Sequence, residues 1–170
     1  SALFGGSTTQ GDKNIAIGKC AAAALTTGES NVAIGNLAMT ALTTGVNNVA
    51  IGLSAADALN SGNNNVAINK NALGQMTIGH CNVAIGICAM GGVTTGAAND
   101  NIAIGSSALL GAAGTVGDFN IAIGKTTMGT GDVSGNDNTA LGRNAAKAIT
   151  AGLNNVAIGL QTMDALTTGI

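Results

Sequence analysis

The stretch Asn-Val-Ala-Ile-Gly at residues 48–52 is one of nine similar stretches spread along the whole chain. The first copy is residues 14–18, the last is residues 155–159, and successive copies begin seventeen to nineteen positions apart. A period this short and this regular indicates a solenoid, in which each repeat forms one coil that stacks on the next. The sequence therefore predicts one domain over residues 1–170, an all-β, parallel β-solenoid (β-roll) of about nine coils. The opening asparagines, which we call the ladder asparagines, are Asn14, Asn31, Asn48, Asn65, Asn82, Asn101, Asn120, Asn138 and Asn155.

The three residues after each ladder asparagine are typical of a β-strand with two apolar faces. The first is Val or Ile in eight copies, the second is Ala in all nine, and the third is Ile in eight. Because side chains alternate along a strand, Val and Ile share one face and Ala points to the other. Strands that are apolar on both faces are typical of parallel sheets that are covered on both sides. An amphipathic helix over residues 21–25 or 145–149 is the alternative for the segment after the strand, although so short a repeat leaves little room for it.

One face of each strand should line the interior of its coil, and the other should meet a further chain. The small size of the alanines suggests close approach of a neighbour, so we expect Val and Ile to fill the coil. The opposite assignment remains possible from the sequence. The subunit-interface candidates are the strand alanines Ala16, Ala33, Ala50, Ala67, Ala84, Ala103, Ala122, Ala140 and Ala157.

Asparagine and glycine bracket each strand. Stacked amides can bond to the coils above and below, so we expect the ladder asparagines to form a structural amide ladder. Gly follows the strand in eight copies and stands three residues before the ladder asparagine in eight. Both glycine columns suit turns that need a positive φ.

Length and charge also vary with position in the repeat. The extra residues of the three longer coils fall near residues 91–98, 111–117 and 129–136, and such insertions form surface loops that are often on the binding face of a solenoid. Basic residues follow the strand and acidic residues precede the ladder asparagine, so opposite edges of neighbouring chains would attract in a closed ring. The simpler interpretation is that turns are where water solvates charges. The bases are Lys19, Lys70, Lys125 and Arg143, and the acids are Asp12, Glu29, Asp100, Asp118 and Asp137.

Composition argues against several classes of function. Six Lys plus Arg and a net charge of −2 give no electrostatic footprint for nucleic acid. No apolar run approaches the roughly 18–20 residues that cross a bilayer. One histidine, His80, which we expect in a turn, leaves no triad or His-rich metal site. We therefore predict no enzyme, no cofactor, no metal, no nucleic-acid partner and no membrane insertion by this segment, and we expect free thiols at Cys20, Cys81 and Cys88.

The repeat resembles the head repeats of trimeric autotransporter adhesins, the YadA-like head, in which Asn-Val-Ala-Ile-Gly precedes a segment of small residues. Similar Thr-Thr-Gly-x-x-Asn-Val-Ala-Ile-Gly repeats occur in phage tail-fibre proteins and other bacterial surface fibres. The resemblance covers nearly the whole chain, with a longer second half of each coil here. It implies a left-handed β-roll, a homotrimer around one axis, and a structural or adhesive segment of an extracellular fibre. The fibre would belong to a cell surface or a virion and attach to a surface receptor or glycan.

Two other functions fit the repeat. A self-assembling extracellular filament is suggested because the chain starts and stops in the middle of a coil, so residues 1–13 would complete the coil left open at residues 167–170 of another copy, giving a head-to-tail polymer. An ice-binding solenoid is suggested by threonine pairs such as residues 26–27 and 43–44. The threonine column lapses at residues 60–61 and 111–117, which makes that function the weaker alternative.

Overall fold

The computed structural model describes residues 11–94, 97–111, 116–131 and 133–169. In these residues every regular element is a β-strand of three residues, and no helix is found that would be long and apolar enough to cross a membrane. Residues 21–25 and 145–149, considered above as helices, lie in turns. The strands are β1 (Ile15–Ile17), β2 (Val32–Ile34), β3 (Val49–Ile51), β4 (Val66–Ile68), β5 (Ile78–His80), β6 (Val83–Ile85), β7 (Ala97–Asn99), β8 (Ile102–Ile104), β9 (Ile121–Ile123), β10 (Thr139–Leu141) and β11 (Val156–Ile158).

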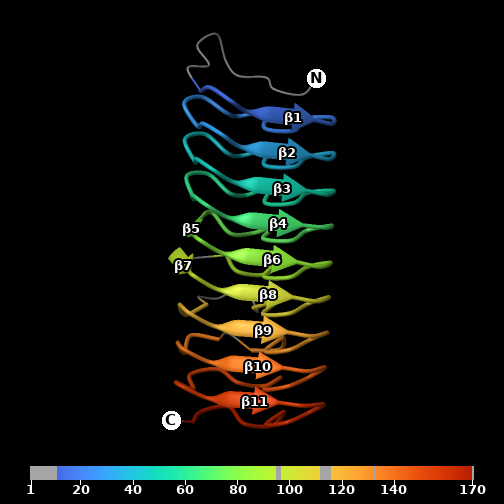
Figure 1. Ribbon diagram of the computed structural model, residues 1–170, viewed down its shortest axis with the longest axis vertical. Helices are drawn as coiled ribbons and strands as arrows, with labels where there is room; N and C mark the ends of the chain where they lie inside the picture. Colours follow the sequence, from blue (N-terminus) through green and yellow to red (C-terminus); the bar gives the residue numbers. More distant parts are fainter. Residues whose placement is uncertain (1–10, 95–96, 112–115, 132, 170) are drawn as a thin grey trace.

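Nine strands form one parallel sheet in the order β1-β2-β3-β4-β6-β8-β9-β10-β11. Like residues pair with like: Ala50 lies opposite Ala33 on one side and Ala67 on the other. Figure 1 shows these strands stacked along a rod, with the chain turning back behind each strand before it enters the next coil. β5 and β7 pair with each other at one edge of the rod. The parallel, all-β solenoid that the period predicts is therefore confirmed.

The strand alanines line the interior of the coil, and Val and Ile face outward. Ala33, Ala50 and Ala67 are fully buried, whereas Ile51 keeps 37% of its surface exposed. Our expectation that Val and Ile fill the coil is therefore wrong, and the opposite assignment holds.

The physical reason for this arrangement lies in the rest of each coil, from the glycine after the strand to the next ladder asparagine, which we call the second limb. The large core side chains come from it: Met39 and Leu42 are fully buried and belong to the same core cluster as Ala33. A coil this short is thin, and protein interiors are close-packed, so a strand opposite Met and Leu has room for only a methyl group. The largest buried side chains are Leu25, Met39, Leu42, Leu59, Leu73, Met76, Met90, Leu109, Met128, Ile149, Val93 and Val133.

The second limb turns tightly by using the left-handed backbone region at residues other than glycine. In one coil these residues are Leu37 (φ 61°), Met39 (φ 51°) and Asn47 (φ 58°), and the same three positions recur in every coil from the one at Asn14 to the one at Asn138. Each such residue costs about 1–2 kcal/mol in local conformation. Hydrogen bonds between coils hold the turn against this cost, as when the Met39 N–H donates to the Ala55 carbonyl oxygen at 2.9 Å.

The two glycine columns have different causes. Gly35, which follows β2, has a φ of 136°, as we expected for this column. Gly28, three residues before a ladder asparagine, does not have a positive φ; a Cβ there would overlap the carbonyl oxygen of Gly45 in the next coil. Lack of space, and not the dihedral angle, therefore selects glycine in the second column.

Candidate functional site

The ladder asparagines lie one above another and bond from coil to coil. The Asn65 Oδ1 accepts hydrogen bonds from the Asn82 backbone N–H at 3.0 Å and from the Asn82 Nδ2 at 3.1 Å. The Asn65 Nδ2 donates to the Asn48 Oδ1 at 3.0 Å and to the Gly79 carbonyl oxygen at 2.7 Å. These amides hold the coils in register, and within the described residues no buried side-chain nitrogen or oxygen lacks a hydrogen-bond partner.

Eight of the nine alanines that we proposed as interface residues lie where another chain cannot reach them. They point into their own coil, against Met and Leu side chains of the second limb. The exception is Ala16, which is only partly buried. A residue without accessible surface cannot contact a neighbour, so the interface prediction for this column is wrong. The remaining members, all 0–2% exposed, are Ala33, Ala50, Ala67, Ala84, Ala103, Ala122, Ala140 and Ala157.

The outward side chains of the nine-stranded sheet form an almost entirely apolar surface, which we call the strand face. Several members are well exposed, including Ile17 at 59%, Leu141 at 44% and Ile158 at 64%. The sequence holds a signal for this outcome, because Met and Leu recur in the second limb and leave no volume for a second large column inside. The strand face consists of Ile15, Ile17, Val32, Ile34, Val49, Ile51, Val66, Ile68, Val83, Ile85, Ile102, Ile104, Ile121, Ile123, Thr139, Leu141, Val156 and Ile158.

A second column of hydrogen bonds, which we did not predict from the sequence, runs two residues before the ladder asparagines. The Asn63 N–H donates to the His80 Nδ1 at 3.2 Å, and the His80 N–H donates to the Asn99 Oδ1 at 3.1 Å. His80 ends strand β5, so our expectation that it lies in a turn is wrong. The sequence does hold a signal for this column, because side chains that can accept a hydrogen bond are frequent two residues before the ladder asparagine. The members of this column are Asn63, His80, Asn99, Asp118 and Asn136.

A hollow opens on the second limb where glycines replace side chains in consecutive coils. Gly74 and Gly91 stand at a position that carries Thr40, Asp57 and Lys147 in other coils. The hollow has a smaller part of about 120 Å³ and an adjoining part of about 500 Å³. We call it the glycine hollow, and it is lined by Asp57, Asn71, Gly74, Gln75, Cys88, Gly91, Gly92, Leu110 and Gly111.

The backbone ladder between coils is open across this hollow. In most other described coils, the residue one position after the equivalent of Gly74 donates a backbone hydrogen bond of 2.8–3.2 Å to the next coil, as Ala41 does to the Asp57 carbonyl oxygen. Within the described residues, no such bond joins Ala58 to Gly74 or Gln75 to Gly91. The carbonyl oxygens of these two glycines accept no bond from the described part of the chain. The hollow therefore lies beside main-chain groups that most other described coils pair with the next coil.

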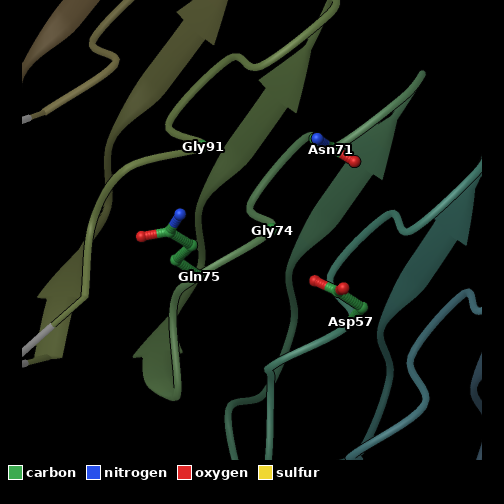
Figure 2. Close-up of a pocket in the computed structure, with 5 residues that line it drawn as sticks. All are labelled: Asp57, Asn71, Gly74, Gln75 and Gly91. Carbon is green, nitrogen blue, oxygen red and sulfur yellow. The ribbon is translucent and has the colours of Figure 1, made fainter. Parts of the chain in front are cut away.

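Asp57 supplies a carboxylate at one end of the glycine hollow. Figure 2 shows Asp57 and Gln75 on either side of Gly74, with Asn71 close by. Burial raises the pKa of Asp57 above its ordinary value, while hydrogen bonds from its own and the Ala58 N–H groups, and from the Ser54 side chain, act against that rise. The carboxylate is thus partly desolvated and open to a ligand that donates hydrogen bonds.

Other reactive groups are sparse in the part of the chain that the structure describes. No three His, Cys, Asp or Glu side chains there are grouped as metal ligands would be. Cys20, Cys81 and Cys88 are free thiols, as we expected. No protein-family model matches the chain, and neither does any curated protein or any solved structure.

Proposed function

We propose that this chain is a structural and adhesive segment of an extracellular fibre, a homotrimer whose subunits meet through their strand faces. The trimer, the left-handed coil and the setting on a cell surface or virion follow the resemblance to autotransporter heads and phage tail fibres. The role is mechanical support and attachment, without catalysis. The exposed, apolar strand face is the observation that supports it.

The strand face leaves large apolar side chains in water when the chain is alone. Contiguous exposed apolar patches on soluble proteins mark interaction sites. Full burial of one Val or Ile side chain stabilises by about 1.5–3 kcal/mol. Partial burial of the outward side chains of nine strands would therefore stabilise the assembly by more than association costs in lost translational and rotational freedom, about 4–15 kcal/mol.

Another copy of this chain is the partner that matches the strand face along its length. The apolar side chains repeat at the spacing of neighbouring strands, about 4.7–4.9 Å. A second strand face has the same spacing over the same length, whereas a globular partner would cover only part of the rod. The bases after the strand and the acids before the ladder asparagine would then meet at the edges of neighbouring subunits.

Light scattering after size-exclusion chromatography tests the assembly. We expect the mass of three chains, and electron microscopy should show short rods of uniform length. A stable monomer would contradict the proposal. Continuous filaments would favour the head-to-tail polymer instead.

A charge pair on the strand face tests whether this surface is the interface. Val66 and Val83 are neighbours in the sheet, so Val66→Lys with Val83→Glu places opposite charges side by side. Both positions are half-buried in a single chain, which should therefore still fold, while burial of the pair between subunits is costly. We expect folded monomers.

The matched control is Ala24→Lys with Ala41→Glu, a similar pair on the second limb, where neither alanine is fully buried. This variant should keep the mass of three chains. Loss of the trimer in both variants, or in neither, would show that the strand face is not the specific interface.

A further inference from the structure

We infer that the glycine hollow is the ligand-binding site of this segment and that its ligand is a neutral carbohydrate. The inference rests on the proposed function, because it assigns attachment to one place on the fibre. The hollow lies on the second limb, which the core separates from the strand face. It therefore stays open to solvent in a trimer that buries the strand faces.

The position of the hollow fits a binding site on a repeat protein. Its lining residues Gly91, Gly92 and Gly111 stand where the sequence of the second limb begins to depart from the common pattern in the longer coils. Insertions on one side of a solenoid commonly mark the binding face. Its larger part, about 500 Å³, falls within the range of about 300–1,000 Å³ seen for small-ligand sites.

The polar lining matches hydroxyl groups, which both donate and accept hydrogen bonds. The Asp57 carboxylate accepts, and the amides of Asn71 and Gln75 donate and accept. The Gln75 N–H and the Gly74 and Gly91 carbonyl oxygens add main-chain groups that have no bond in the described protein. In most other described coils the corresponding groups are paired, as when the Ala41 N–H donates to the Asp57 carbonyl oxygen at 3.0 Å, so a ligand rich in hydroxyls would supply the missing bonds.

The remaining lining selects against anionic ligands. Among the described residues no Lys or Arg lines the hollow, and Asp57 would repel a carboxylate, sulfate or phosphate. Leu110 offers an apolar surface for the C–H face of a sugar ring. These groups favour a neutral saccharide over sialylated or sulfated glycans.

Saturation-transfer difference NMR on the whole protein tests the inference. The probes are methyl α-D-glucopyranoside, methyl α-D-mannopyranoside and methyl β-D-galactopyranoside, with N-acetylneuraminic acid as the anionic probe. We expect a signal from at least one neutral glycoside and none from the acid. Silence from all three glycosides, or a signal from the acid alone, would overturn the inference.

Two variants locate the binding. Asp57→Asn keeps the shape of the side chain and removes its charge, and Gln75→Ala introduces the residue that Ala41 and Ala58 provide at the same position of other coils. Each should raise the Kd at least fivefold while circular dichroism stays unchanged. The control is Asp164→Asn, at the position of Asp57 in the last coil, which should bind as wild type does.

Unchanged binding in both variants would place the sugar elsewhere and overturn the inference. The oligomeric state separates this result from the fibre proposal. A trimer that binds no neutral glycoside would contradict only the proposed binding site. A monomer that binds a neutral glycoside at the hollow would contradict only the proposed trimer.

Discussion

The side chain of Asn65 joins three coils, because it accepts two hydrogen bonds from Asn82 and donates to Asn48 and Gly79. Asn65→Ala would leave buried donors and an acceptor without partners, at about 1–3 kcal/mol for each group. We expect the free energy of unfolding to fall by about 3 kcal/mol. Urea denaturation at a fixed protein concentration measures this change.

Asn155→Ala provides the comparison, because Asn155 is only partly buried and lies in the last coil. Water can reach the groups that this substitution exposes, so the loss should be less than half that of Asn65→Ala. Equal losses would mean that burial of the amide ladder is not the source of its effect.

Thr126 carries a β-branched side chain at a φ of 55°. This region is strained for β-branched residues, whereas asparagine tolerates it and occupies the same position as Asn144 in the next coil. Thr126→Asn should therefore raise the free energy of unfolding by about 1 kcal/mol. The reciprocal change, Asn144→Thr, should lower the free energy of unfolding by a similar amount. If denaturation curves do not show opposite changes for the two variants, backbone strain at Thr126 is not the cause.

Asp57 gives a pH dependence whose sign follows from its raised pKa. The folded state holds the Asp57 proton more tightly than the unfolded state does, so this group favours folding below its ordinary pKa of 3.8. That contribution is lost as the pH rises through the folded-state pKa. Asp57→Asn should therefore be at least as stable as wild type at pH 7, and it should lose this advantage in acid.

Thermal unfolding across a pH series checks this prediction, with Asp164→Asn as the control for the loss of one charge. A variant less stable than wild type at pH 7 and more stable in acid would show that the carboxylate is favoured, and not penalised, in the folded state.

At the scale of the elements, each strand has a tightly packed inner residue and a freer outer one. Ala84 in β6 is fully buried, while its neighbour Val83 is half-buried on the strand face. Ala84→Val would force two methyl groups into a thin coil, and overpacking of this kind costs about 1–3 kcal/mol. We expect a loss of this size in urea denaturation.

Val83→Ala is the matched change on the outer side of the same strand. It should weaken the trimer, seen as dissociation on dilution, and leave the unfolding of isolated chains nearly unchanged. If Val83→Ala destabilised the single chain more than Ala84→Val, the inward and outward assignment of the faces would be wrong.

The strands themselves were predictable from the sequence because the same residues recur at every coil. Stacking in register then sets Ala50 between Ala33 and Ala67 without any further information. The left-handed residues of the second limb were not predictable, because Leu37 and Met39 carry no local preference for a positive φ. Hydrogen bonds between coils impose that conformation, and they exist only once the coils are stacked.

The whole molecule behaves as a stack in which each coil contacts its neighbours alone. Stability in such proteins is close to a sum over coils and their interfaces. Deletion of residues 31–47 removes one complete coil and brings Asn48 into register with Asn14. We expect this variant to fold with circular dichroism per residue like that of wild type and a moderately lower melting temperature.

Deletion of residues 31–38 removes about half a coil. It is the control that separates loss of register from simple shortening of the chain. The shortened coil cannot pair its strand and close its turns, so this variant should lose cooperative unfolding. If the two deletions were equally tolerated, stacking in register would not be the basis of the fold.

The sequence by itself determined the period, the parallel strands and the position of every ladder asparagine, because these features repeat with the coil and need only stacking to become structure. Only the tertiary structure decided which strand face is interior, because Val, Ile and Ala are all apolar and the choice depends on the Met and Leu side chains opposite. It alone also revealed the glycine hollow, since Gly74, Gly91, Gly92 and Gly111 form a hollow only when adjacent coils bring them together.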